Sequence, residues 1–274
     1  MKLATLRRDG ATVAARQEGQ DWVVIDGVAS VGELVKTQDW QATAAAADGE
    51  RLPAAEAQLE AVVPTPGKVI CVGLNYRSHI QEMGRELPTY PTLFAKFPET
   101  LTGPFDDVVA VEEDPELDWE GELVLVVGSE VYRATEEEAA SAIAGYTAAN
   151  DISMRGWQFR SSEWLQGKIW AKSTPLGPVM VTADDFDYQA STLRTRVNGE
   201  VMQEHSTGDL VFTPEQLVAY ISTMLPLKPG DVVLTGTPGG VGRARDPQVY
   251  LKAGDTVEVE IEDIGSMSSR MVEP

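Results

Sequence analysis

The residues with the clearest chemical potential form an acidic motif that leads into an apolar segment. The motif is Asp118-Trp119-Glu120-Gly121-Glu122, and Leu123-Val124-Leu125-Val126-Val127 follows it. The apolar segment has the length and the β-branched content of a strand buried on both faces. Because side chains alternate along a strand, Glu120 and Glu122 point to one face and Gly121 to the other. Two neighbouring carboxylates at the mouth of a buried strand require a proton, a cationic partner or a bound metal.

A third acid, Asp151, closes the apolar segment that begins at Tyr146. If Asp151 lies beside Glu120 and Glu122, the three carboxylates form an all-oxygen ligand set that suits Mg²⁺ or Mn²⁺. The alternative is that the strand begins at the surface and that both glutamates are solvated, which is the ordinary state of acidic side chains. The metal hypothesis therefore depends on the position of Asp151.

His79 and Glu82 form a second candidate pair. They follow a predicted buried strand, residues 68–74, and a spacing of three residues makes them neighbours on a short helix. A carboxylate that holds an imidazole creates a general base near neutral pH. The alternative is an exposed helical pair without function. The chain has only two histidines, and functional residues often follow strand ends.

The glycine-rich segment from Gly236 to Gly242 has two interpretations. It lacks the Gly-Lys-Ser/Thr ending of a P-loop and the glycine spacing of a dinucleotide fingerprint. It is either a tight turn between strands or a small anion-binding loop made of backbone N–H groups and the Thr237 hydroxyl. Lys172 is a further candidate, because a lysine between small residues and after Trp170 is unusual for a solvated side chain.

Composition limits the partners of this protein of 274 residues. Its net charge of −21 disfavours nucleic acid and anionic membranes, and an anionic substrate needs local positive charge. The single cysteine, Cys71, excludes an internal disulfide. The N-terminal residues lack the apolar region of a signal peptide, and no segment has the length of a membrane span. We therefore expect a cytoplasmic protein.

The segment Pro64-Thr65-Pro66-Gly67 predicts a boundary between two units. Residues 1–63 are expected to form a small N-terminal accessory domain, and residues 64–274 the catalytic domain. Hairpins are predicted at Asp9-Gly10 and Asn198-Gly199, and helices over 135–145 and 213–225. The predicted fold class is α+β, with mixed sheets rolled into a sandwich or barrel-like core and a few outer helices. Alternating βαβ units are not evident, which disfavours a Rossmann-like sheet.

From Pro64 onward the chain resembles the fumarylacetoacetate hydrolase family. The motifs that carry the resemblance are Val72-Gly73-Leu74-Asn75-Tyr76 with His79 and Glu82, Asp118-Trp119-Glu120-Gly121-Glu122-Leu123, Asn150-Asp151 with Arg155 and Gln158, Lys172-Ser173, Asn198-Gly199, Pro229-Gly230-Asp231 and the segment from Thr235 to Gly242. Their order and spacing are specific only in combination. The first unit resembles the small N-terminal domain that bacterial members often carry.

The resemblance implies a role for each of these side chains. Glu120, Glu122 and Asp151 match the ligands of a divalent metal, usually Mg²⁺. His79 and Glu82 match the pair that activates water in hydrolytic members, and Lys172 matches the lysine beside the metal. Substrate contacts are expected from Arg77, Lys96, Arg155, Gln158 and Thr237. One departure is Gly156, where many members have aspartate. Members are commonly homodimers.

The expected activity is metal-dependent hydrolysis of a C–C bond in an acylpyruvate-type 2,4-dioxo acid. Fumarylpyruvate or acetylpyruvate would give pyruvate plus an acid, a reaction type of aromatic catabolism. One alternative is a decarboxylase or isomerase that acts on oxaloacetate or 2-hydroxyhepta-2,4-diene-1,7-dioate at the same metal site. Another is a non-catalytic module that binds metal and keto acids. The pair of His79 and Glu82 favours hydrolysis, because the other reactions need no attacking water.

Overall fold

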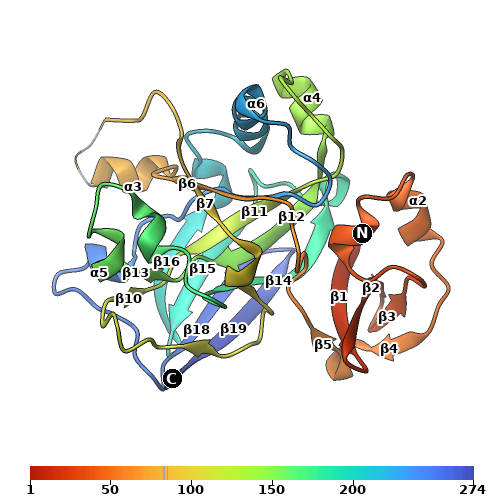
Figure 1. Cartoon of the computed structure of the whole chain (residues 1–274), viewed down its shortest axis with the longest axis horizontal. Helices are drawn as coiled ribbons and strands as arrows, with labels where there is room; N and C mark the ends of the chain where they lie inside the picture. Colours follow the sequence, from red (N-terminus) through yellow and green to blue (C-terminus); the bar gives the residue numbers. More distant parts are fainter. Residues whose placement is uncertain (83, 85) are drawn as a thin grey trace.

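Sheets dominate the chain, in an α+β architecture that confirms the predicted fold class (Figure 1). The computed structural model describes residues 1–82, 84 and 86–274, without the side chains of His79 and Glu82. The helices are α1 (Val31–Leu34), α2 (Trp40–Ala45), α3 (Arg77–Glu82), α4 (Glu136–Ser141), α5 (Arg155–Gln158) and α6 (Pro214–Met224), with 3₁₀ turns η1 (Ala54–Glu56), η2 (Pro98–Thr100), η3 (Trp164–Gly167), η4 (Ala183–Asp185), η5 (Thr207–Asp209) and η6 (Gly242–Ala244).

One large sheet runs through the whole molecule in the order β4-β3-β2-β1-β14-β12-β11-β17-β6-β7, with β5 on β1 and β8 on β14. Its strands are β1 (Lys2–Arg8), β2 (Ala11–Glu18), β3 (Asp21–Val24), β4 (Arg51–Pro53), β5 (Gln58–Leu59), β6 (Val69–Gly73), β7 (Thr92–Lys96), β8 (Leu101–Thr102), β11 (Gly121–Val127), β12 (Ile143–Asn150), β14 (Thr174–Thr182) and β17 (Val232–Leu234). Most neighbours are antiparallel, which agrees with the exclusion of a Rossmann-like sheet.

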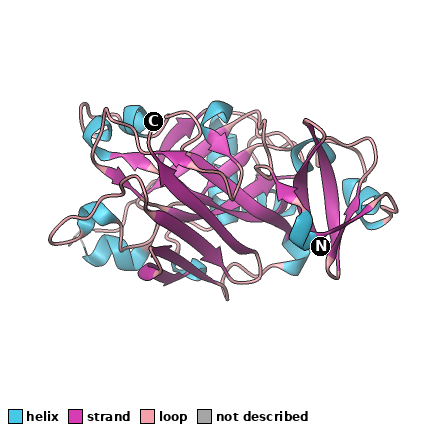
Figure 2. Ribbon diagram, turned by 90° about the horizontal axis from the view of Figure 1, so that it is seen from below, coloured by secondary structure: helices cyan, strands magenta, loops and turns pink. Residues whose placement is uncertain are grey.

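A second sheet, in the order β16-β15-β18-β19-β9, packs against the first. Its strands are β9 (Val108–Val109), β15 (Thr192–Val197), β16 (Glu200–Ser206), β18 (Thr256–Ile261) and β19 (Gly265–Val272), and β10 (Leu117–Asp118) pairs separately with β13 (Ser153–Met154). The hairpin predicted at Asn198-Gly199 joins β15 to β16. Figure 2 shows these strands as the core of the molecule, with helices at its periphery.

Strand β11 is buried along its whole length, as its apolar sequence predicts. Leu123 and Leu125 belong to the core shared with β15 and β18. Val124 and Val126 face the other way, into a core that includes Leu3 from the N-terminal unit. The strand therefore contributes alternate side chains to two cores, and burial on both faces holds its acidic N-terminal end in a fixed position.

The N-terminal unit lies at one end of the molecule, where Figure 1 shows β1 to β5 with α2. The hairpin predicted at Asp9-Gly10 joins β1 to β2. Strand β1 also pairs with β14, with Leu3 opposite Met180, so the large sheet continues across the predicted boundary. The division into residues 1–63 and 64–274 remains a prediction about independent folding units.

The two predicted helices differ in how well their ends agree with the sequence pattern. Helix α6 begins at Pro214 and ends at Met224, close to its predicted range. Helix α4 ends at Ser141, short of the predicted end near Gly145, because β12 already begins at Ile143. Among the residues that the structure describes, no helix combines the length and the apolar character needed to cross a membrane.

Candidate metal centre and active site

Three acidic side chains converge where β11 begins and β12 ends. Ligand oxygens of Glu120, Glu122 and Asp151 all lie within 4.8 Å of one another. Glu120 is 8% exposed, Glu122 2% and Asp151 0%. The structure thus brings together the three residues that the sequence predicts as metal ligands. Because both glutamates are buried, the alternative that they are solvated is wrong.

The pairing of β11 with β12 explains this convergence. Gly121 lies opposite Asn150, so the residue after the end of β12, Asp151, comes to the side of Glu120. The Asp151 N–H donates to the Glu120 carbonyl oxygen at 2.8 Å, and the Asn150 Oδ1 accepts from the Glu120 N–H at 3.0 Å. A shift of one residue would turn each side chain to the other face, so this register determines the site.

Two buried lysines contact the acids. Lys168 Nζ lies 2.6 Å from Glu120 Oε2 and 2.9 Å from Asp151 Oδ2, and Lys96 Nζ lies 2.5 Å from Asp151 Oδ1. Burial opposes the charge of Asp151, but Lys168 and Lys96 bring its pKa below the ordinary value. Burial likewise opposes the charge of Lys168, and the two carboxylates raise its pKa above the ordinary value. The ion pairs therefore hold these groups charged.

The position predicted for the lysine beside the acids is wrong. Lys172 is exposed, with a backbone φ of 53°, and its N–H donates to the Glu99 carbonyl oxygen. Lys168 occupies the expected place, because the chain from the turn η3 carries it into the interior. A lysine between small residues and after a tryptophan favours Lys172 in the sequence. Lys168 stands between a glycine and an isoleucine, which does not distinguish it from other lysines.

Arg155 forms a third cationic contact, with Glu120. Its Nη1 lies 2.6 Å from Glu120 Oε1, and its Nη2 lies 2.8 Å from Asp118 Oδ2. Nη1 also donates to Gln158 Oε1 at 2.9 Å. Burial opposes the guanidinium charge, but Glu120 and Asp118 raise the pKa of Arg155 further above its already high ordinary value. Arg155 and Gln158 therefore contact the protein's own groups here, and their predicted contacts with substrate remain predictions.

Glu122 differs from its neighbours because it has no cationic partner among the described residues. The Gly236 N–H donates to Glu122 Oε2 at 2.8 Å. Burial raises the pKa of Glu122 well above its ordinary value, and the charges of Asp151 and Glu120 raise it further. This carboxylate needs either a proton or a further cation.

The donors and charges of this region fit a divalent metal. We define the buried charge cluster as the carboxylates of Asp118, Glu120, Glu122 and Asp151 with the cations Lys96, Arg155 and Lys168. The cluster contains four carboxylates and three cations among the described residues. Glu122 is the carboxylate that has no cationic partner among them. Carboxylate oxygens are the ligands preferred by Mg²⁺ and Mn²⁺, so Glu120, Glu122 and Asp151 can hold such an ion.

The glycine-rich segment binds anions, and the anions are carboxylates of the same chain. Besides the Gly236 bond to Glu122, the Gly242 N–H donates to Asp118 Oδ1 at 2.6 Å, and the Arg243 N–H donates to Asp118 Oδ2 at 3.0 Å. The half-buried Thr237 hydroxyl donates to the Gly121 carbonyl oxygen at 2.9 Å. Both predicted interpretations thus hold in part: the segment connects strands, and its N–H groups stabilise buried acids.

His79 and Glu82 lie on α3, but their side chains are outside the described part of the structure. The start of α3 is anchored near the charge cluster. Asn75 Nδ2 donates to the Thr235 carbonyl oxygen at 2.8 Å, next to the Gly236 that binds Glu122. Arg77, predicted to contact substrate, is exposed and donates to the Val211 carbonyl oxygen at 3.2 Å.

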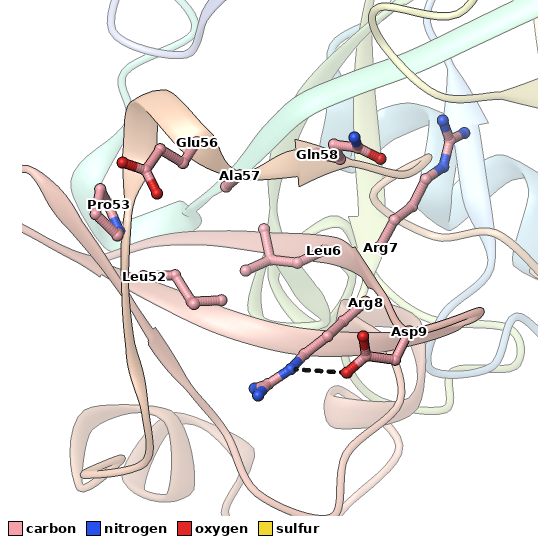
Figure 3. Close-up of a pocket in the computed structure, with 9 residues that line it drawn as sticks. All are labelled: Leu6, Arg7, Arg8, Asp9, Leu52, Pro53, Glu56, Ala57 and Gln58. Carbon is pink, nitrogen blue, oxygen red and sulfur yellow. Dashed lines mark ion pairs between the residues drawn. The ribbon is translucent and has the colours of Figure 1, made fainter.

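A surface pocket of about 360 Å³ lies far from this cluster, on the N-terminal unit between β1 and η1 (Figure 3). Figure 3 shows Arg7 and Arg8 pointing to opposite sides of it. Arg8 already pairs with Asp9 and Glu50, and Arg7 with Glu60 and Asp106. Its charged lining residues are Arg7, Arg8, Asp9 and Glu56, and both arginines are already paired, so this pocket is not the candidate site.

Together, the mixed sheets and the buried triad of acids define a family of metal-using enzymes, the fumarylacetoacetate hydrolases. The chain belongs to this family: the sequence profile described as Fumarylacetoacetate (FAA) hydrolase C-terminal matches residues 68–272.

Similar proteins carry several different names. The chain is 41% identical to rat "Oxaloacetate tautomerase Fahd2a, mitochondrial" and 42% identical to human "Oxaloacetate tautomerase FAHD2A, mitochondrial", in each case over 81% of this chain and 71% of the relative. A solved fumarylacetoacetate hydrolase from Exiguobacterium antarcticum matches with a TM-score of 0.89 and 32% identity over 100% of both chains. A 2-hydroxyhepta-2,4-diene-1,7-dioate isomerase from Mycobacterium marinum matches with a TM-score of 0.82 and 29% identity, over 100% of this chain and 98% of the other.

The family is therefore settled, but its members' names cover hydrolysis, isomerisation and tautomerisation. The tautomerase names support the alternative activity predicted from the sequence better than the predicted C–C hydrolysis. Because those relatives are named mitochondrial, the cytoplasmic location predicted for this chain stays a prediction. So does the predicted homodimer.

Proposed function

We propose that this protein is a divalent-metal-dependent tautomerase that interconverts the enol and keto forms of oxaloacetate or a closely related 2-oxo diacid. The observation that carries the proposal is the buried charge cluster with its excess carboxylate at Glu122. The choice among reactions is supported by the relatives named oxaloacetate tautomerase, at 41–42% identity, and by the isomerase among the similar structures.

The charges of the cluster favour a small dianion once a divalent cation is present. With its carboxylates ionised, the cluster carries one net negative charge, and a divalent cation changes this to one net positive charge. The rest of the protein carries a strongly negative charge, so this local reversal is what an anionic substrate needs. When bound, the metal supplies a Lewis acid that polarises the 2-oxo group.

Lys168 has one N–H bond left to donate to the substrate. An ammonium has three N–H bonds, and carboxylates of Glu120 and Asp151 accept two of them. The third can donate to the substrate oxygen on which negative charge develops, and removal of a preorganised donor of this kind costs about 10²–10³ in kcat. Lys168 is thus assigned to binding and to electrostatic stabilisation.

Tautomerisation of a 2-oxo acid transfers protons without breaking the carbon skeleton. A base removes a proton from C3, the C–H electron pair forms the C2=C3 bond, and the carbonyl electron pair moves to the oxygen, which takes a proton. His79, with Glu82, is the proposed group for the proton at C3, since α3 is anchored beside the Thr235 and Gly236 backbone. The same pair would activate water in acylpyruvate hydrolysis, so the reaction must be decided by assay.

The test is a substrate panel with purified protein. Decay of the ultraviolet absorbance of enol-oxaloacetate reports tautomerisation, and pyruvate release reports decarboxylation or cleavage of acetylpyruvate and fumarylpyruvate. A change in the ultraviolet absorbance of 2-hydroxyhepta-2,4-diene-1,7-dioate reports its isomerisation. We expect enol decay to accelerate with Mg²⁺ or Mn²⁺ and to return to the spontaneous rate with EDTA. The variant Glu122→Gln should lose metal-dependent activity, whereas Asp48→Asn, an exposed acid on the N-terminal unit, should retain it.

Each outcome assigns a reaction. Acceleration of acylpyruvate cleavage without an effect on enol-oxaloacetate would reject the tautomerase proposal in favour of the hydrolase. Isomerisation of a 2-hydroxydiene diacid alone would restrict the substrate to that class. Metal binding without turnover of any member of the panel would indicate a binding module.

A further inference from the structure

Gly121, the residue between the two glutamates, has both of its backbone polar groups engaged by one hydrogen-bond circuit. Its N–H donates to Gln203 Oε1 at 3.1 Å, and its carbonyl oxygen accepts from the Thr237 hydroxyl at 2.9 Å. Gln203 Nε2 closes the circuit by donating to Thr237 Oγ1 at 2.8 Å, and also donates to the Pro238 carbonyl oxygen at 2.9 Å. We call this set the Gln203 circuit.

Steric contacts press the same elements together. A Cβ at Gly121 would lie 2.3 Å from Thr195 Oγ1 on β15, so the side of Gly121 away from the acids is filled. A Cβ at Gly240 would lie 2.1 Å from the Met202 carbonyl oxygen on β16. The glycine-rich segment and the start of β11 therefore both rest on the second sheet, and Gln203 bonds to both of them.

We propose that Gln203 is a positioning residue, which fixes the backbone between Glu120 and Glu122 and orients the Thr237 hydroxyl so that the carboxylates are preorganised for the metal. Only a side-chain amide can accept from one group and donate to two others at once, as this site requires. Gln203 is 1% exposed, so water does not replace these bonds when they are removed. It acts on the metal ligands through the backbone of Gly121 and does not itself ligate.

The first experiment measures Mn²⁺ binding to the purified full-length protein by calorimetry, which does not require turnover. Gln203→Met removes all three bonds while keeping a side chain of similar length. Loss of partners that orient metal ligands typically weakens metal affinity about 10–100-fold, and we expect a rise in Kd of about tenfold because Gln203 acts one step removed. The matched change Gln17→Met, on β2 of the N-terminal unit, should leave the Kd within about twofold. A Kd for Gln203→Met within that same range would overturn the proposal.

A double-mutant cycle tests whether Gln203 acts through Thr237. Thr237→Val removes the hydroxyl that joins Gln203 to Gly121. If both belong to one circuit, the double variant binds Mn²⁺ nearly as well as the weaker single variant. If the losses of Mn²⁺ binding free energy in the two single variants add fully in the double variant, Gln203 acts independently of Thr237. That result would reject the proposed circuit. If Gln203→Met fails to fold, Gln203→Asn decides by the same Kd criterion, because it retains the amide but withdraws it by one methylene.

The inference rests on the proposed function for the identity of the bound group, yet the two can fail separately. Mn²⁺ binding that depends on Gln203, without turnover of any substrate, would support the positioning role and reject the tautomerase. If the Gln203 variant keeps both the turnover and the Mn²⁺ affinity of the unaltered protein, the positioning role is rejected and the tautomerase is supported. Absence of Mn²⁺ binding by the unaltered protein would reject both.

Discussion

At the scale of single residues, Lys168 joins two of the three candidate metal ligands. It bonds to Glu120, which precedes β11, and to Asp151, which follows β12, so it restrains their separation as well as neutralising charge. A buried lysine with two carboxylate partners retains its proton because loss of the proton would leave both acids uncompensated. In the proposed function, the same ammonium also donates to a substrate bound at the acids.

We predict that Lys168→Met lowers kcat/KM by about 10²–10³, since it removes a preorganised charge-bearing donor. Lys172→Met should change kcat/KM by less than about twofold, because its side chain is exposed. Steady-state assays of both variants, with folding checked by circular dichroism, distinguish the two lysines. The opposite order of effects would restore the assignment that the sequence pattern favoured.

Gly156 shows a second residue-scale effect, which concerns stability. A Cβ there would lie 2.8 Å from Asp114 Oδ1, and Asp114 is buried with its carboxylate bonded to the N–H groups of Glu116 and Trp157. The Asp114 carboxylate, from another segment of the chain, thus fills the space beside Gly156 and caps α5.

We predict that Gly156→Ala lowers the free energy of unfolding by about 1–3 kcal/mol, through displacement of Asp114. At an open helical site the same change would stabilise by up to about 1 kcal/mol. Denaturant unfolding of Gly156→Ala, Asp114→Ser and the double variant tests this. The double variant should lose less free energy of unfolding than the sum of the losses in the two single variants. A loss equal to that sum would contradict the steric explanation.

These residues also show what the sequence could and could not predict. Glu120 and Glu122 were identifiable because strand alternation is a local property, and the family resemblance pointed to Asp151. Lys168 and Asp114 were not identifiable, because their roles depend on where the turn η3 and the segment before β10 fold back onto α5. Gln203 was visible only as part of a hairpin strand, and its bonds reach residues more than 30 positions away.

At the scale of elements, the hairpin β15–β16 and the turn η5 that follows it support both the candidate metal ligands and α3. Gln203 on β16 contacts the acidic strand, and Asp209 in η5 accepts from the N–H and the hydroxyl of Ser78, at 2.9 and 2.5 Å. Asp209 therefore satisfies a backbone donor in the first turn of α3, which carries His79. Turn signals and alternation predicted the hairpin, but not this contact between it and α3.

We predict that Asp209→Ala lowers the free energy of unfolding by about 1 kcal/mol, as for the loss of a helix cap. It should also lower kcat/KM while leaving the Kd for Mn²⁺ unchanged, because Asp209 contacts α3 and not the charge cluster. Hydrogen exchange of the peptide over residues 76–82 should accelerate. The control is Asp48→Ala, an exposed acid on the N-terminal unit. A loss of Mn²⁺ affinity in Asp209→Ala would contradict this prediction, because it would show that the contact between Asp209 and α3 also positions the charge cluster.

At the scale of the whole molecule, the sequence boundary near Pro64 does not coincide with a boundary in the hydrophobic core. Leu3, Ile25 and Leu34 share one core cluster with Val124 and Leu234 of the central sheet. The fold class and most strands were predictable, because alternation and turn residues are local. The shared core was not, because pairing of β1 with β14 joins residues nearly 180 positions apart.

A partly buried ionic contact joins the same two regions and gives a pH-dependent prediction. Arg7 on β1 contacts both oxygens of Asp106, with Nη1 at 2.6 Å and Nη2 at 2.5 Å. The Arg7 guanidinium, aided by the Thr102 hydroxyl and the Gly103 N–H, lowers the pKa of Asp106 to about 2. An unfolded aspartate has a pKa of about 3.9, so the folded state favours the charged form.

We therefore expect Asp106→Asn to lower the free energy of unfolding at pH 7 by about 1–2 kcal/mol, a figure reduced from the full linkage value because both side chains are partly exposed. Because the folded pKa lies below the unfolded one, this contribution is complete above about pH 5 and is lost as the pH falls toward 2. Unfolding curves between pH 7 and pH 2 should thus converge for the variant and the unaltered protein. Asp107→Asn, at the exposed neighbouring position, should show no such convergence, since its curve should follow that of the unaltered protein throughout. A constant difference between Asp106→Asn and the unaltered protein down to pH 2 would show that the contact stabilises the join through packing and not through charge.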